Sequence, residues 1–185
     1  MDFKIDENGL MTSCLGSDVT VRIPDGVKKI ACSAFREAEE AYGKTWYKPN
    51  KTMETVIIPA SVETVGFGAF QYCKALRCVR IEGNGLRKID GCAFSICESL
   101  EEVELPEGIL EIGEDAFTSC PRLKRIILPK SVKVLGNGLF TCSGVERIYY
   151  RGSEADFASI EKEYALDPDK LVYDCTLALG ELPDR

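Results

Sequence analysis

The chain has 185 residues, a length suited to one domain, and its 23 basic and 30 acidic residues give a formal net charge of −7. This acidic balance argues against nucleic-acid binding, which needs clustered positive charge. The sequence contains no histidine, which excludes Ser-His-Asp and Cys-His catalysis and imidazole metal ligands. We therefore expect a protein that is not an enzyme and holds no cofactor or metal. An enzyme of unknown type is an alternative that no cleft-forming motif supports.

The first 18 residues contain no basic segment that leads into an apolar one, so they do not resemble a secretory signal. No apolar run in the chain approaches the ~20 residues of a membrane helix. Nine cysteines, an odd number, fit no secreted disulfide framework. We expect a cytoplasmic protein with no membrane association; the alternative is a secreted or cell-surface protein whose leader was removed. Phe3 and Ile5 alternate as in an edge strand, and residues 1–18 are predicted to form an N-terminal cap.

A repeat runs through residues 19–150. Its clearest mark is an Ala-Phe pair followed by Cys three residues after the Phe, and four phenylalanines recur 24, 23 and 23 residues apart. A period of ~20–29 residues is typical of leucine-rich solenoids, in which each coil buries its apolar face against the next. These phenylalanines are Phe70, Phe94, Phe117 and Phe140.

Each repeat also contains a short apolar alternation that a proline or glycine ends. This pattern predicts one strand per coil with alternate side chains in the core, so that neighbouring strands form a parallel sheet. A second apolar pair follows each strand, and the Ala-Phe pair is predicted to lie in a brief helical turn. Six strands are predicted, centred on Val21, Val56, Val79, Val103, Ile126 and Ile148.

The repeat unit resembles the BspA-like leucine-rich repeat family. The best copies are LEEVELPEGILEIGEDAFTSC at 100–120 and METVIIPASVETVGFGAFQYC at 53–73, and the ending VERIYYRGSEADFASI at 145–160 is similar to that family's exit from its last coil. The resemblance extends over roughly residues 19–174. It implies a protein-binding role, and some surface-exposed members of the family are adhesins for extracellular matrix proteins. A bacterial surface adhesin is therefore the alternative to a non-catalytic protein-interaction module.

We predict a single α/β domain over 1–185: a right-handed leucine-rich-repeat solenoid of the α-β horseshoe type, with a short parallel sheet and helical turns. About five to six repeats precede a C-terminal cap at residues 151–185. Within this cap, Ser153 to Asp156 resembles a capping box that opens a helix through about Tyr164. Leu171 to Tyr173 is predicted to be a closing strand.

One insertion breaks the period, at residues 36–52, and it contains the only tryptophan, Trp46, beside Tyr47. The first half of the insertion is rich in helix formers, so the helical turn after Ser33 is predicted to extend to about Tyr42. Insertions in solenoids often lie on a binding face, which makes Trp46 a candidate binding residue. The alternative is that the two aromatic side chains pack back over the edge of the coils.

The cysteines Cys73, Cys97, Cys120 and Cys142 are predicted to fall at one position per coil. Such thiols could bind zinc or an iron–sulfur cluster. However, a column spreads its thiols over three coil spacings, whereas a metal needs its ligands around one point. We interpret the column as buried core packing, since buried cysteine behaves as a small apolar side chain.

The outward side of the predicted sheet is the remaining candidate surface. Repeat proteins bind along such faces, and arginine and tyrosine are frequent at interface hot spots. Ile57, Ile127 and Tyr149 are predicted to be exposed there. We expect a monomer that binds an unknown protein across four consecutive strands spanning about 15 Å. The candidate residues are Arg80, Glu104, Arg125, Arg147 and Tyr149.

Overall fold

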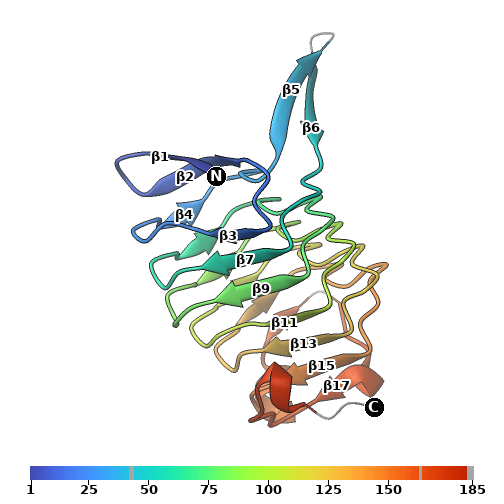
Figure 1. The fold of residues 1–185 in the computed structure, drawn as a ribbon. Helices are drawn as coiled ribbons and strands as arrows, with labels where there is room; N and C mark the ends of the chain where they lie inside the picture. Colours follow the sequence, from blue (N-terminus) through green and yellow to red (C-terminus); the bar gives the residue numbers. More distant parts are fainter. Residues whose placement is uncertain (42–43, 163, 183–185) are drawn as a thin grey trace.

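The protein is a β-solenoid built from two sheets of mainly parallel strands, seen in a computed structural model (Figure 1). The structure describes residues 1–41, 44–162 and 164–182, with the side chains of 37–47 outside the description. Each coil contributes one strand to the first sheet, one to the second sheet and one connecting turn. Inward side chains from both sheets and from the turns form one continuous apolar core.

The first sheet has seven strands in the order β17-β15-β13-β11-β9-β7-β3, all parallel. It confirms the six strands predicted from the apolar alternation, and its seventh strand confirms the predicted closing strand. Their bounds are β3 Thr20–Arg22, β7 Thr55–Ile58, β9 Cys78–Ile81, β11 Glu102–Glu104, β13 Arg125–Leu128, β15 Arg147–Tyr150 and β17 Leu171–Val172.

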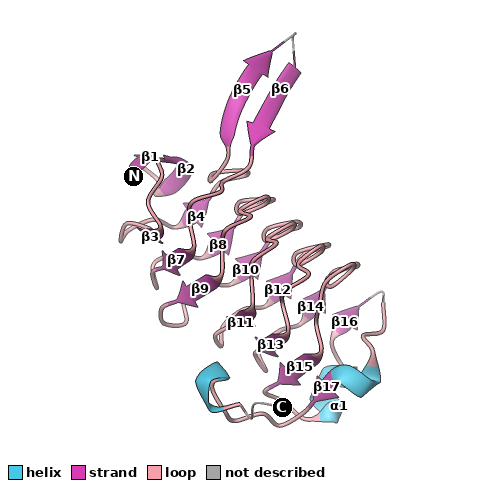
Figure 2. Ribbon diagram, turned by 45° about the vertical axis from the view of Figure 1, so that its right-hand side comes forward, coloured by secondary structure: helices cyan, strands magenta, loops and turns pink. Residues whose placement is uncertain are grey.

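The second sheet has eight strands in the order β1-β2-β4-β8-β10-β12-β14-β16 (Figure 2). Only β1 and β2 pair antiparallel, which confirms the predicted strand at Phe3 and Ile5 and places it at the sheet edge. The second residue of each later apolar pair lies in a two-residue strand of this sheet, and the first residue of the pair lies just before that strand. Their bounds are β1 Asp2–Ile5, β2 Leu10–Leu15, β4 Lys29–Ile30, β8 Thr64–Val65, β10 Lys88–Ile89, β12 Glu111–Ile112, β14 Val134–Leu135 and β16 Glu161–Lys162.

The Ala-Phe segments form tight turns, so the prediction of helical turns and of an α-β horseshoe was wrong. In every coil whose turn is fully described, the residues two before and two after the phenylalanine adopt a positive φ, as Cys92 (55°) and Ile96 (60°) do around Phe94. A helix needs consecutive residues in the right-handed region, and two left-handed residues four apart prevent this. The other positive-φ residues at these positions are Ser33, Gly68, Tyr72, Asp115, Ser119, Gly138 and Cys142.

The alternating conformation lets each turn bond to the turn of the next coil. The amides of Phe94 and Ile96 donate to the carbonyls of Ala116 and Thr118 at 2.8 and 2.9 Å, and equivalent bonds recur from coil to coil. The phenylalanine rings stack above one another, with centroid separations of 4.5, 5.0, 5.3 and 6.2 Å from first to last. The turns therefore form a third ladder that closes the core between the two sheets.

The insertion forms a β-hairpin, which contradicts the helix predicted to reach about Tyr42. Strands β5 (Glu37–Ala41) and β6 (Lys44–Lys48) pair antiparallel, with Glu39 opposite Trp46. Figure 1 shows the hairpin projecting from the N-terminal end of the stack. The predicted packing of Trp46 and Tyr47 over the coil edge lies outside the described residues.

The C-terminal region begins with the predicted capping box. Ser153 accepts from the amide of Asp156 at 3.1 Å, and Asp156 accepts from the amide of Ser153 at 3.0 Å. The helix α1 (Glu154–Ala158) is shorter than predicted, because the chain enters β16 three residues later to pair with β14. The 3-10 turns η1 (Pro168–Lys170) and η2 (Leu179–Glu181) follow. Within the described residues, no helix is long and apolar enough to cross a membrane.

Candidate protein-binding surface

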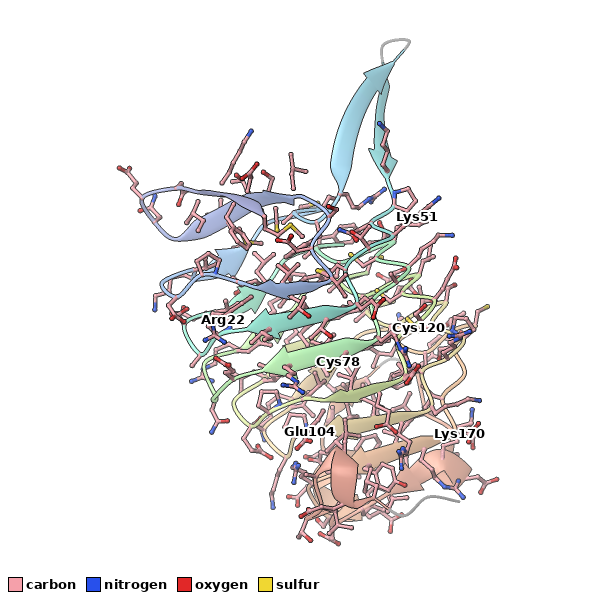
Figure 3. All side chains as sticks on the ribbon, viewed as in Figure 1. Arg22, Lys51, Cys78, Glu104, Cys120 and Lys170 are labelled. Atoms are coloured by element: carbon pink, nitrogen blue, oxygen red, sulfur yellow. The ribbon has the colours of Figure 1, made fainter. Side chains whose placement is uncertain are left out.

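The outward side chains of the first sheet form two columns, because its strands are paired in register. One column runs from Thr20 through Thr55 and Cys78 to Glu102, and the other contains Arg22 beside Ile57. Figure 3 shows Arg22, Cys78 and Glu104 on the same side of the stacked strands. The sheet thus offers the flat surface on which the candidate residues were predicted to lie.

Half of this surface is covered by the chain itself. Residues 174–182, which we name the C-terminal strap, cross the outer side of β13 and β15. Ile127 and Tyr149 are 0% and 9% exposed, because they pack against Cys175 and Leu182 of the strap. The prediction that Ile127 and Tyr149 are exposed was therefore wrong, and Tyr149 is not available to a partner while the strap is in place.

The candidate side chains on the covered half are engaged within the molecule. The carboxylate of Glu104 accepts from Arg151 at 2.7 Å. Arg125 forms an ion pair with Glu102 of the neighbouring strand. Arg147 donates to the carbonyl of Asp169 at 2.9 Å. A partner would have to compete with these contacts.

Arg80 on β9 differs from the other candidates. Its side chain is exposed, and no described residue forms an ion pair or hydrogen bond with it. Its neighbours Ile57 and Cys78 are partly exposed, whereas Arg22 is engaged by Glu82 through two hydrogen bonds of 2.7 and 2.8 Å. We name the outward side chains of β3, β7 and β9 the open face. Trp46, the alternative candidate, has its backbone in β6 and its side chain outside the described residues.

The cysteine column is buried as predicted at Cys73, Cys97 and Cys120, each 0% exposed. The Cys97 thiol donates to the carbonyl of Phe70 at 3.3 Å, and burial raises the pKa of Cys120 to about 12. Cys142 was wrongly placed in this column. It lies two residues after its phenylalanine rather than three, so it occupies the left-handed turn position and is exposed, and Ser143 takes the column position.

The family model for the BspA type leucine rich repeat region matches residues 40–160 with six copies. No curated protein sequence matches the chain. The fold is similar to a leucine-rich repeat protein of T. pallidum, with 30% identity and a TM-score of 0.67 over 80% of this chain and 67% of that one. It is also similar to a leucine-rich cell surface protein of Faecalibacterium prausnitzii, with 28% identity and a TM-score of 0.72.

That second similarity covers 89% of this chain but only 41% of the F. prausnitzii protein. A leucine-rich repeat protein of Eubacterium ventriosum is 25% identical, with a TM-score of 0.58 over 71% of this chain and 32% of that one. The chain thus spans less than half the length of these two relatives. The family model covers well over half of the chain, and the repeat that it describes is the coil seen in the structure. The protein belongs to the BspA-type leucine-rich repeat family.

Proposed function

We propose that the protein is a non-catalytic protein-binding module and that its open face contacts the partner. The observation that carries this proposal is Arg80, an exposed guanidinium with no partner among the described residues, set beside the partly exposed Ile57. A surface of this kind favours a segment that combines a carboxylate with an apolar side chain. The carboxylate would pair with Arg80, and the apolar side chain would cover Ile57.

The strap supports the choice of the open face as the binding site. It shows that the outer side of β13 and β15 can hold a chain segment through apolar contacts and a hydrogen bond from Leu179 to Glu104. The open face continues the same sheet over three strands at a spacing of ~4.8 Å, so it can hold a segment that crosses the strands. The strap already occupies the other half, which leaves the open face as the accessible part.

The test begins with affinity capture from a lysate of the source organism and identification of the bound protein by mass spectrometry. Binding constants with the purified partner then decide the site. We expect Arg80→Glu to weaken binding at least tenfold. Arg147→Ala is the matched control, because Arg147 lies on the covered half and bonds to Asp169. Unchanged affinity of Arg80→Glu would overturn the proposed face, and loss of binding on Trp46→Ala alone would assign the site to the hairpin.

A location at the cell surface is the second candidate, and the similarity to the F. prausnitzii cell surface protein favours it over the expected cytoplasm. In this case the partner is a host or extracellular matrix protein. Protease treatment of intact cells, followed by detection of the protein with an antibody, separates the two locations. Digestion in intact cells supports the surface location, and digestion only after lysis supports the cytoplasm.

A further inference from the structure

The ladder of turns has a constant direction. In successive coils the amides of Tyr72, Ile96 and Ser119 donate toward the C-terminal end, with bonds of 3.0, 2.9 and 2.8 Å to carbonyls of the next turn. The phenylalanine of each turn is at the same time stacked on the ring of the next. Every turn except the last is therefore covered by a peptide segment that supplies carbonyl oxygens and an aromatic ring.

The last turn of the ladder, at residues 138–143, lacks this cover. No described residue accepts a hydrogen bond from the amides of Gly138, Phe140 or Cys142. The reason lies in the sequence of the coil that follows. In the preceding coils the phenylalanine comes five residues after the last residue of the second-sheet strand, as Phe140 does after Leu135. In the next coil Lys162 pairs with Leu135, and the residue five positions after Lys162 is Asp167, which has no aromatic ring.

A cavity of about 480 Å³ lies where the next phenylalanine would stack. One wall is the turn with Phe140, together with the core residues Val145 and Ile148. The opposite wall is the segment 164–170, which contributes Leu166 and Lys170. This volume is within the range of ligand pockets, and its walls combine apolar side chains with the carboxylate of Asp167 and the ammonium group of Lys170. Figure 3 shows Lys170 at the C-terminal end of the stack.

We propose that this end cavity binds a phenylalanine side chain carried by a peptide segment of a partner protein. The ring stacks on the outer side of Phe140 and continues the column of rings. Carbonyl oxygens on both sides of the phenylalanine accept from the amides of Gly138, Phe140 and Cys142, as in the preceding coils. The site is separate from the open face and does not depend on it.

A second copy of this chain is a poor occupant. Its first turn, with Ala34 and Phe35, has the right residues, but the carbonyl of Ala34 already accepts from the amide of Cys14 at 2.7 Å. Strands β1 and β2 also lie at that end of the stack (Figure 1). Head-to-tail stacking would have to displace this N-terminal layer, so a phenylalanine segment from another protein fits better.

The test uses a peptide that copies residues 113–119, GEDAFTS, acetylated and amidated, added to the full-length ¹⁵N-labelled protein. We expect saturable shifts of the amide signals of Gly138, Phe140 and Cys142. The amide of Phe117, which already donates to Leu139 at 3.1 Å, should stay unchanged. The peptide GEDAATS, which lacks the ring, should bind at least tenfold more weakly. Equal binding of the two peptides, or shifts confined to β3, β7 and β9, would overturn the proposal.

A variant of the cavity wall tests the same site by changing the protein instead of the peptide. Asp167→Phe should place a ring on Phe140, raise the melting temperature and weaken peptide binding at least tenfold. Asp167→Asn is the matched control, because an amide oxygen can still accept from the Asp169 amide as Asp167 does at 3.1 Å. This control should bind like the unmodified protein. Full peptide affinity in a folded Asp167→Phe protein would show that the cavity is not the site.

Discussion

The carboxylate of Glu104 accepts a hydrogen bond from the backbone amide of Leu179 at 3.2 Å, although 75 residues separate the two in the sequence. Its other oxygen accepts from Arg151, whose guanidinium also donates to the carbonyl of Leu177 at 3.4 Å. These bonds hold the strap on the outer side of the sheet. The side chains that it buries form a small cluster separate from the main core, so we expect the strap to open without unfolding of the coils.

Leu182→Ala should release the strap and leave the solenoid folded. Leu182 is 6% exposed, and truncating a buried leucine costs about 2–5 kcal/mol. Few hydrogen bonds hold the strap, so a loss of this size should detach it from the sheet. We expect faster hydrogen exchange at the amides of Cys175 and Leu179, with a melting temperature changed by less than about 2 °C. Leu177→Ala, at an exposed side chain, is the control. A fall in melting temperature typical of a core truncation would place the strap within the cooperative unit.

Labelling of the thiols in the folded protein should divide the cysteines by position. The exposed Cys32 and Cys142 should react rapidly with a thiol reagent. Cys73, Cys97 and Cys120 should react only after denaturation, because burial both blocks access and raises the pKa of each thiol. Mass spectrometry of peptides after timed labelling measures the rates. Rapid labelling of Cys97 in the folded protein would contradict the packing of the column.

Alkaline pH should destabilise the protein through the same thiols. Burial raises the pKa of Cys120 from its ordinary value of 9.0 to about 12. Below pH 9 the thiol is protonated in both states, and its contribution to stability is complete. Between pH 9 and 12 the unfolded chain loses the proton and the folded chain keeps it, so stability falls by about 1.4 kcal/mol per pH unit for each such thiol.

Urea unfolding at pH 8, 9, 10 and 11 measures this slope. Cys120→Ala should be less stable at pH 8 but should show a shallower fall above pH 9, since one titrating thiol is gone. Cys142→Ala is the control, because this thiol is exposed and should leave the slope unchanged. Equal slopes in Cys120→Ala and the unmodified protein would contradict the prediction.

Ser119→Gly should stabilise the protein by roughly 0.5–1 kcal/mol. Ser119 has a φ of 56°, which costs a residue with a side chain about 1–2 kcal/mol and costs glycine almost nothing. Glu114→Gly, in the same turn but without a positive φ, should instead destabilise by about 0.5–1 kcal/mol. Thermal or urea unfolding measures both. If both substitutions destabilised the protein, the segment would behave as the helical turn predicted from the sequence.

The strands were predictable because their signal lies in the alternation of apolar residues. Val56 and Ile58 point into the core and Ile57 points outward, as a period of two requires. The turns were not predictable in this way. The residues of the Ala-Phe segments carry no local signal for a left-handed conformation, and Ile96, a β-branched residue, adopts its positive φ with its amide bonded to the next coil.

The candidate surface was predicted less well than the fold. The alternation correctly placed Arg80 and Tyr149 on the outer side of the sheet, but it carries no information on what crosses that side. Tyr149 is covered because the strap, which lies outside the repeat, returns over β15. Leu179 and Leu182 are the signal that could have revealed this, since apolar residues in a C-terminal cap need a surface to cover.

The constant direction of the turn ladder gives the stack an electrical polarity. The amides that bond from turn to turn all point toward the C-terminal end, so their dipoles add along the stack and leave a partial positive charge at that end. Residues 151–162 and 164–182 bring seven acidic and only three basic side chains to the same end. The cap is therefore attracted to the end of the stack at which it lies. The carbonyl oxygens of the turn ladder point toward the N-terminal end of the stack. The same acidic cap placed at that end would therefore be repelled.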